Sequence, residues 1–444
     1  MGKLSFEEKT RRNLDNAIAN IASRRADYVH NPNSDFTRDR KLSMADTMRL
    51  VLSMDGGSLA KELYTHHSLG GSQITPSGFV QQRSKIKSAA FYALLQQFNQ
   101  SEIVRKHYKD YRVLAVDSSA INQPRDPKLD SFMCTSRDPH GINQTQMSVI
   151  HDVLNKTVLD VDLRPRPKMD EKGALIAMLQ RNSFSEKTIM LMDRGYEGYN
   201  MFAHLIEKEN CDLLCRVRNQ RGGMREIQNL PMEEIDCDIL FEITTTQTVE
   251  DKAAQRIHIP TASPKGNAES NLRRIRKWDF SSPYTMRLRA VRFQLSSGEY
   301  ETIVTTLPRF IFSIQDIKDL YHMRWGIETA FRDIKYALGL INLHSKKEDL
   351  VMQEIYAALI AYNFCTRIVS SVVVDKKEHT VHAYQVNFKM AVYLCKKFYR
   401  DTISVGHNLI EEIGKYIEAV RPGRQDLRKL RHKGFTGFVY RVAA

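Results

Sequence analysis

Four side chains suited to phosphate and metal chemistry lie at fixed spacing in the stretch YHMRWGIETAFRDIKYALGL: Tyr321, Arg324, Glu328 and Lys335. At about 100° per helical residue, they fall within roughly a 60° sector of one helix face. The adjoining sector is apolar and consists of Met323, Ile327, Ala330, Phe331, Ile334 and Leu338. One carboxylate between two cations at the edge of a half-buried helix suits a metal ligand among phosphate contacts. The alternative is a surface helix with ordinary ion pairs between neighbouring turns.

Two further carboxylates follow apolar runs that are typical of buried strands. Asp117 follows YRVLAV, and Asp193 follows KTIMLM. Catalytic groups gather at such strand ends in open α/β sheets, so we expect both side chains to be adjacent if the strands are neighbours. With Glu328 they would offer three oxygen ligands, which suit two Mg²⁺ or Mn²⁺ ions and phosphodiester displacement. Other strand acids lack a surrounding signature and are interpreted as solvated: Asp152, Asp160 and Asp162.

The composition favours a polyanionic partner. The chain of 444 residues carries 66 Lys and Arg against 52 Asp and Glu, a formal net charge of +14. Nucleic acid is the simplest partner for such a basic excess, whereas charge alone is also compatible with an ordinary basic protein. The six cysteines lack zinc-site spacing, and no apolar run is long enough to span a membrane. We therefore expect a cytoplasmic protein with reduced thiols and no membrane partner.

Residues 1–105 are predicted to form a helical DNA-binding domain. Thr75 is a good N-cap with Pro76 in the first turn, and a polar, basic helix follows. A short helix, a turn and a basic helix are compatible with a helix-turn-helix reader. The expected DNA contacts are Arg83, Lys85 and Lys87. The alternative is a helical bundle with a solvated charged face.

The rest of the chain predicts an α/β fold in four segments. Strands and helices alternate over 106–218, as expected for a sheet with helices packed against it. A β-rich insertion covers 219–307, and the helices that carry the four spaced residues cover 308–375. Residues 376–444 are predicted to form a basic, helical C-terminal region.

The spacing Y-x2-R-x3-E-x6-K resembles the signature of DDE transposases of bacterial insertion sequences, and more narrowly of the insertion sequence four family. VDSSAINQP around Asp117 and DRGY from Asp193 resemble the two aspartate segments of that family, although Ser118 stands where glycine is common. The resemblance implies a ribonuclease-H-like core interrupted by the β insertion. It also implies that Asp117, Asp193 and Glu328 are the catalytic, metal-binding residues.

The activity implied by the resemblance is DNA cleavage at terminal inverted repeats and strand transfer into target DNA, within a synaptic homodimer. Tyr321, Arg324 and Lys335 would hold the DNA backbone near the scissile phosphate. Trp278 and Tyr300 are candidates for stacking on a flipped base. Two alternatives remain: a related metal-dependent nuclease with the same core, and a domesticated DNA-binding protein that does not cleave. The expected location is the bacterial cytoplasm, at the nucleoid when the protein is on DNA.

Overall fold

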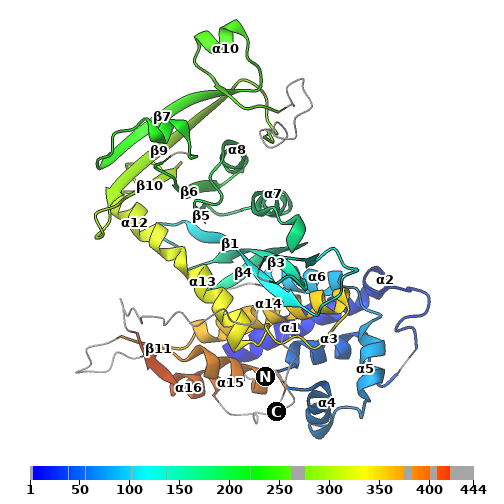
Figure 1. The fold of residues 1–444 in the computed structure, drawn as a ribbon. Coiled ribbons are helices and arrows are strands. Elements are labelled where there is room, and N and C mark those ends of the chain that lie inside the picture. Colours follow the sequence, from blue (N-terminus) through cyan, green and yellow to red (C-terminus); the bar gives the residue numbers. More distant parts are fainter. Residues whose placement is uncertain are drawn as a thin grey trace.

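The computed structural model describes residues 4–38, 40–55, 57–101, 104–136, 138–220, 222–261, 276–374, 383–400 and 408–420. Its centre is a ten-stranded mixed sheet in the order β2-β3-β1-β5-β6-β10-β9-β7-β8, with β4 also paired to β3 (Figure 1). The predicted α/β class is therefore confirmed. Most of the basic loop before Trp278 and the basic end of the chain lie outside the described residues.

The first half of the sheet contains an antiparallel part and a parallel part. Its strands are β1 (Arg112–Gln123), β2 (Phe132–Met133), β3 (Ile142–Asp152), β4 (Thr157–Pro165), β5 (Thr188–Met192) and β6 (Cys211–Val217). β3 is antiparallel to β1 and β4, whereas β5 is parallel to both β1 and β6. Every residue of β5 is buried, as expected for an apolar strand inside a parallel sheet.

The β-rich insertion extends this sheet and does not form a second one. It contains α9 (Arg225–Gln228), β7 (Ile235–Thr244), α10 (Val249–Ala253), β8 (Ile257–His258), β9 (Tyr284–Gln294) and β10 (Tyr300–Thr305). β10 pairs antiparallel with both β6 and β9, so the insertion continues the central sheet at one edge. The insertion lies at the top of Figure 1.

Helices cover the two faces of the sheet. One face packs against α7 (Glu171–Arg181) and α8 (Tyr199–Ile206), and a short helix η1 (Arg166–Lys168) precedes α7. The other face packs against α12 (Ile314–Met323), α13 (Trp325–Arg332), η2 (Asp333–Ala337) and α14 (Glu348–Ser370). Alternate residues of β1 enter the two cores, because Leu114 and Val116 face α7 whereas Val113 and Ala115 face α14.

The N-terminal and C-terminal helices share one core with α14. The N-terminal helices are α1 (Phe6–Ser23), α2 (Arg25–Tyr28), α3 (Met44–Ser53), α4 (Leu59–Ser68), α5 (Pro76–Arg83) and α6 (Ser88–Asn99). The C-terminal elements are β11 (Tyr384–Val386), α15 (Phe388–Tyr399), α16 (Leu409–Gly414) and β12 (Ile417–Ala419). Ile18, Phe91, Leu359 and Cys395 all belong to the same buried cluster.

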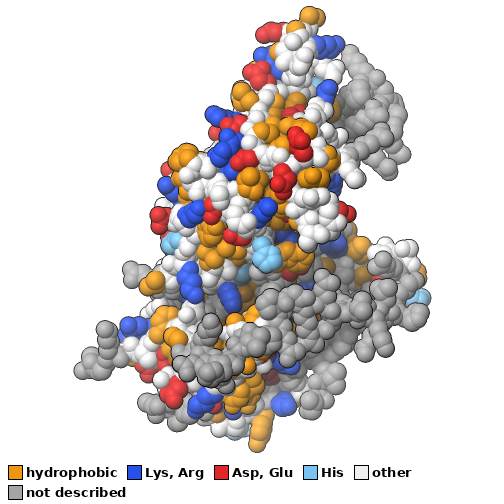
Figure 2. All heavy atoms as spheres, turned by 90° about the vertical axis from the view of Figure 1, so that its left-hand side faces the viewer, with side chains coloured by type: hydrophobic (Ala, Val, Ile, Leu, Met, Phe, Trp, Pro, Cys, Tyr) orange, Lys and Arg blue, Asp and Glu red, His pale blue; other side chains and the backbone are white. Residues whose placement is uncertain are grey.

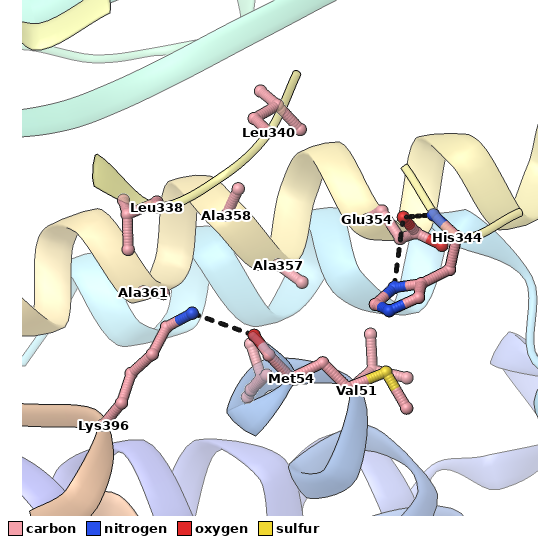
Figure 3. A pocket seen from close by; sticks show the side chains of 11 residues that line it. Val51, Met54, Leu338, Leu340, His344, Glu354, Ala357, Ala358, Ala361 and Lys396 are labelled. Carbon is pink, nitrogen blue, oxygen red and sulfur yellow. Dashed lines mark hydrogen bonds and ion pairs between the residues drawn. The ribbon is translucent and has the colours of Figure 1, made fainter. Parts of the chain in front are cut away.

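Polar contacts also connect the N-terminal helices to the C-terminal helices. Lys396 of α15 donates a hydrogen bond to the carbonyl of Met54, directly after α3 (Figure 3). The predicted N-cap is confirmed, because the Thr75 hydroxyl accepts a hydrogen bond from the Gly78 N–H at the start of α5. Because the N-terminal helices share one core with α14, the helical segment before β1 lacks a core of its own. The domain boundaries stay predictions.

Candidate active site

Asp117 and Asp193 emerge side by side from neighbouring strands. The last residue pair between parallel strands β1 and β5 is Ala115 with Leu191. Asp117 lies two residues further along β1, and Asp193 is the first residue after the end of β5. Residues two apart share a sheet face. Asp117 therefore extends from the face on which Ala115 packs toward α13 and α14, and Asp193 lies close enough to raise the pKa of Asp117.

The prediction that Asp117 ends its strand is wrong, because β1 continues to Gln123. Beyond Ala115 the strand leaves β5 but keeps antiparallel pairing with β3, including Asp117 opposite Val149 and Ser118 opposite Ser148. The polar sequence SSAINQ is therefore a strand whose backbone hydrogen bonds are satisfied on one side. No turn follows the aspartate, and the Ser118 hydroxyl is 2.7 Å from that of Ser148.

The pKa of Asp117 reflects both its burial and the two other predicted carboxylates. Burial raises the pKa of Asp117 to about 6, and the neighbouring Asp193 and Glu328 carboxylates add to this effect. The Ser118 N–H, 2.7 Å from Oδ1 of Asp117, and the Arg324 guanidinium act in the opposite direction. Like charges at a partly buried site favour a bound cation.

The prediction that the four spaced residues lie on one regular helix is wrong, because they are distributed over α12, α13, the residue between them and η2. α12 ends at Met323, and the N–H of Ile327 bonds the Arg324 carbonyl three residues back. η2 is a turn of π-helix, in which the Leu338 N–H reaches the Asp333 carbonyl five residues back. The wider turn contains Lys335 and changes its angular spacing from Glu328, and such turns are frequent at functional sites.

Arg324 bridges two of the carboxylates. Its Nη2 is 3.0 Å from Oε1 of Glu328, and its Nη1 is 3.8 Å from Oδ2 of Asp117. The Arg324 side chain is 8% exposed and that of Glu328 is 42% exposed, so the arginine is the inner partner. Its Nε is buried without a hydrogen-bond partner. The structure therefore brings Asp117, Glu328 and Arg324 together.

Tyr321 and Lys335 occupy different positions around this cluster. Tyr321 is 7% exposed, and the Arg324 guanidinium lies 5.8 Å from the centre of its ring. Burial raises the pKa of its hydroxyl. Lys335 donates a hydrogen bond of 2.9 Å to the carbonyl of Ala120, three residues beyond Asp117 on β1, and burial lowers its pKa. Lys335 therefore connects the π-helical turn to the backbone of the aspartate strand.

Two further groups near the aspartates, Tyr196 and Glu171, have no role predicted from the sequence. Tyr196 of the DRGY segment is 1% exposed, and burial raises the pKa of its hydroxyl, with Asp117, Glu171 and Asp193 adding to the effect. The Glu171 carboxylate, in the first turn of α7, accepts a hydrogen bond from the Gln146 amide. Its pKa is raised by burial and by Asp193. No spacing pattern in the sequence marks Glu171, because its proximity comes from the packing of α7 on the sheet.

The carboxylates of Asp117, Asp193 and Glu328 are suitable ligands for divalent ions, but in this structure they are not close enough together to surround one. Asp117 and Asp193 supply hard oxygen ligands on one face, and Glu328 faces them from α13. Within the described part of the chain, no three His, Cys, Asp or Glu side chains are grouped closely enough to hold an ion. The guanidinium of Arg324 bridges Glu328 and Asp117 in this arrangement.

The prediction that Arg83 contacts DNA is contradicted by its burial. Arg83 is 2% exposed and donates hydrogen bonds to Gln353, Ser345, Glu354 and the carbonyl of Leu350. A guanidinium enclosed by these partners anchors α5 to α14 and cannot reach a phosphate without unfolding the contact.

The other two basic candidates of this segment are half-buried. Lys85 donates to the Gln82 side chain at 2.8 Å, and the Nζ of Lys87 is 3.5 Å from the carbonyl of Asp27. Both retain a path to solvent, so their role in DNA binding stays a prediction. On the face in Figure 2, Lys and Arg of the described part are interspersed with acidic and apolar side chains.

The two stacking candidates differ in their surroundings. Trp278 donates its indole N–H to the carbonyl of Ser281 and contacts the rings of Phe280 and Tyr284, with ring centroids 5.6 and 5.4 Å away. Trp278 thus belongs to an aromatic cluster beside β9. Tyr300 is the first residue of β10 and accepts a hydrogen bond at its carbonyl from Asn219. Base stacking by Trp278 or Tyr300 stays a prediction.

The prediction that the other strand acids are solvated is wrong for two of them. Asp152 and Asp160 are 0% exposed. Asp152 pairs with Arg112 at 2.7 Å, and Asp160 pairs with Arg181 at 2.7 Å. Burial of a carboxylate is tolerated here because a guanidinium neutralises it. Asp162 is also paired, with Arg164 at 2.6 Å.

The fold and the site together define an α/β protein with a carboxylate cluster where two parallel strands meet a helix. The chain matches the family described as Transposase DDE domain over residues 108–364, more than half of its length, and therefore belongs to that family. This confirms the predicted family.

No helix among the described residues has the length and apolar character needed to cross a membrane.

Two sequence relatives agree with this assignment. The chain is 44% identical to the transposase InsG for insertion sequence element IS4 of Escherichia coli (strain K12), over 65% of this chain and 60% of the relative. It is 37% identical to a probable transposase for insertion sequence element IS5377 of Geobacillus stearothermophilus, over 18% of this chain and 20% of the relative. The matches thus span 60% or less of these relatives. A structure of the piggyBac transposase synaptic complex with hairpin DNA aligns with 93% of this chain and 84% of its own, at 10% identity and a TM-score of 0.43.

Proposed function

We propose that the protein is a metal-dependent transposase that cleaves DNA at the terminal inverted repeats of an insertion sequence and joins the ends to target DNA. The observation that carries the proposal is the parallel pairing of β1 with β5: Asp117 on β1 lies near Asp193, which directly follows β5. Glu328 approaches the same face from α13 and contributes to the raised pKa of Asp117. Family membership supports the same activity.

A ribonuclease-H-like core is supported by the sheet itself. The strand order β4-β3-β1-β5-β6 combines an antiparallel set of three with two strands parallel to β1. The insertion enters after β6, and the helix with Glu328 follows it. The chain therefore returns to the aspartates only after the insertion has been completed.

Asp117, Asp193 and Glu328 would hold Mg²⁺ or Mn²⁺, as two ions. When bound, such ions stabilise the attacking and leaving oxygens of a phosphodiester displacement. The chain itself orients the DNA: a guanidinium at Arg324 can hold a phosphate through two parallel hydrogen bonds. Tyr321 supports that guanidinium from beneath, and Lys335 holds the π-helical turn against β1.

The partners that we propose are the inverted repeats and target DNA, with a homodimer in the synaptic complex and a location in the bacterial cytoplasm. A related nuclease would share the carboxylates but would leave unjoined ends. A domesticated binding protein is disfavoured by the proximity of Asp193 and Glu328 to the half-buried Asp117, because neighbouring carboxylates repel one another and serve no purpose in simple DNA binding.

The test is cleavage and joining of DNA that carries the repeats flanking the gene. Cleavage should be abolished by each of Asp117→Asn, Asp193→Asn and Glu328→Gln, whereas binding to the repeat should stay largely intact. The reason is that the ions are needed for the displacement at phosphorus and not for DNA binding. Cleavage should need Mg²⁺ or Mn²⁺ and fail in Ca²⁺. Asp162→Asn is the control, since this strand acid lies outside the cluster. Near-normal cleavage by a variant would remove that residue from the active site, and cleavage without joining would favour the nuclease.

A further inference from the structure

Arg324 holds a position that a divalent ion would also need. Its guanidinium lies 3.0 Å from Glu328 and 3.8 Å from Asp117, two of the three proposed ion ligands. We propose that, without DNA, Arg324 acts as an internal counter-ion that competes with the metal, and that a DNA phosphate draws it away. Metal loading would then depend on DNA. The inference rests on the proposed function and specifies how that site is regulated.

The present position of Arg324 does not satisfy all of its donors. Nε is buried without a hydrogen-bond partner, although the rest of the guanidinium meets carboxylates. A buried donor without a partner is unfavourable, so a second arrangement in which all donors are used becomes competitive. A phosphate offers several acceptor oxygens to one guanidinium fork.

A cavity beside Arg324 can receive that phosphate. A space of about 450 Å³ between α12 and the strands of the insertion is lined by Arg216, Lys318, Tyr321, Arg324 and Trp325, together with acidic Glu301 and Asp319. Arg216 is paired with Glu301 at 3.1 Å, so Lys318 and Arg324 are the cations of this lining that would attract an anion. The 53% exposed Trp325 ring lies 5.0 Å from the guanidinium carbon. Arg324 therefore lies between Asp117 and Glu328 on one side and, on the other, a cavity lined by three cations and two acids.

The exchange couples the two ligands. An ion held by Glu328 and the aspartates would displace the Arg324 guanidinium from the same carboxylate oxygens, because two positive charges bound to the same oxygens repel each other. A phosphate that holds Arg324 in the cavity removes the competitor. Linkage then requires that DNA raise the metal affinity by the same factor by which metal raises the DNA affinity.

The experiment measures Mn²⁺ binding to the full-length protein without DNA, by electron paramagnetic resonance of the free ion. Arg324→Gln should bind Mn²⁺ at least about tenfold more tightly than the wild type, a change that corresponds to about 1.4 kcal/mol. Arg332→Gln is the matched control, because this exposed arginine of α13 pairs only with Asp333 at 3.8 Å among the described contacts; its Mn²⁺ affinity should equal that of the wild type. Equal or weaker binding by Arg324→Gln would overturn the proposal, since the guanidinium would then order the carboxylates for the ion.

Two further measurements keep the result interpretable. If Arg324→Gln does not fold, Arg324→Lys takes its place: an ammonium pairs with one carboxylate only, so a smaller gain in Mn²⁺ affinity is expected, and no gain overturns the idea. A duplex with the terminal repeat should raise the Mn²⁺ affinity of the wild type but not that of Arg324→Gln. Failure of the proposed function is separate, because it would appear as a wild type that neither cleaves nor joins this duplex.

Discussion

Arg83 of α5 and Glu354 of α14 form an ion pair of 3.1 Å in which both side chains are almost fully buried, at 3% and 7% exposure. The Glu354 carboxylate also accepts a hydrogen bond from the backbone N–H of His344, at the edge of the cavity in Figure 3. Cations around this carboxylate lower its pKa although burial opposes them. The pair fastens the N-terminal helices to the long helix beside the active site.

We predict that Arg83→Ala destabilises the fold by about 3–5 kcal/mol, because it leaves the Glu354 charge buried without its partner. Urea unfolding of the full chain measures the change. Lys87→Ala is the control and should change the free energy of unfolding by less than about 0.5 kcal/mol. Adding Glu354→Gln to Arg83→Ala should restore part of the loss. Unchanged stability with weakened DNA binding would return Arg83 to the DNA interface.

Lys85 and Lys87 test the proposed DNA contact of the N-terminal helices. Each phosphate contact that is lost should lower the slope of log affinity against log salt by about one. Lys85→Gln and Lys87→Gln should therefore bind the repeat more weakly at low salt, measured by fluorescence anisotropy over a salt series. The full chain is needed, because α1 and α6 share their core with α14. An unchanged slope in both variants would move the contact to another surface.

Lys335 should act on cleavage by positioning the π-helical turn against β1, because its ammonium donates a hydrogen bond of 2.9 Å to the Ala120 carbonyl. Lys335→Met should release the π-helical turn from β1 and slow cleavage by about 100-fold, the loss that a misplacement of about 1 Å produces. Mn²⁺ affinity without DNA and the salt slope of DNA binding should stay at wild-type values. A lower salt slope would instead identify Lys335 as a direct phosphate contact. Arg332→Met is the control for loss of a cation from the same helical region.

His151 predicts a pH dependence of stability. Its ring is fully buried, Nε2 lies 3.2 Å from the Tyr362 hydroxyl, and burial lowers its pKa from 6.5 to about 4. The unfolded chain takes up a proton near pH 6.5 while the folded protein stays neutral there. Stability is therefore complete above about pH 6.5 and is lost as the pH falls toward about 4, by about 3 kcal/mol.

Unfolding in urea at about pH 7.5 and about pH 4.5 measures this effect. Other groups also titrate in this range, so the wild type is compared with His151→Asn. The wild type should lose about 2–3 kcal/mol more than the variant between the two conditions. Equal losses would mean that the ring is protonated in the folded protein as well.

The sequence by itself determined the local features and the identity of the chemical groups. Apolar runs located the strands before Asp117 and Asp193, and the Thr75 cap was correctly placed. These features depend on neighbours within a few residues, so spacing and side-chain type suffice to predict them. The spacing around Glu328 also led to the correct family.

Only the tertiary structure decided which of these groups meet. The register of β1 against β5 makes the two aspartates neighbours, and it depends on backbone pairing between segments far apart in the sequence. Arg83 and Asp160 carry charges that favour a solvated surface, yet each is buried because a distant partner neutralises it. The π-helical turn that contains Lys335 packs against α14 and α15, and Lys335 joins it to β1. Charge and spacing are local properties, whereas burial and partnership depend on segments that the fold brings together.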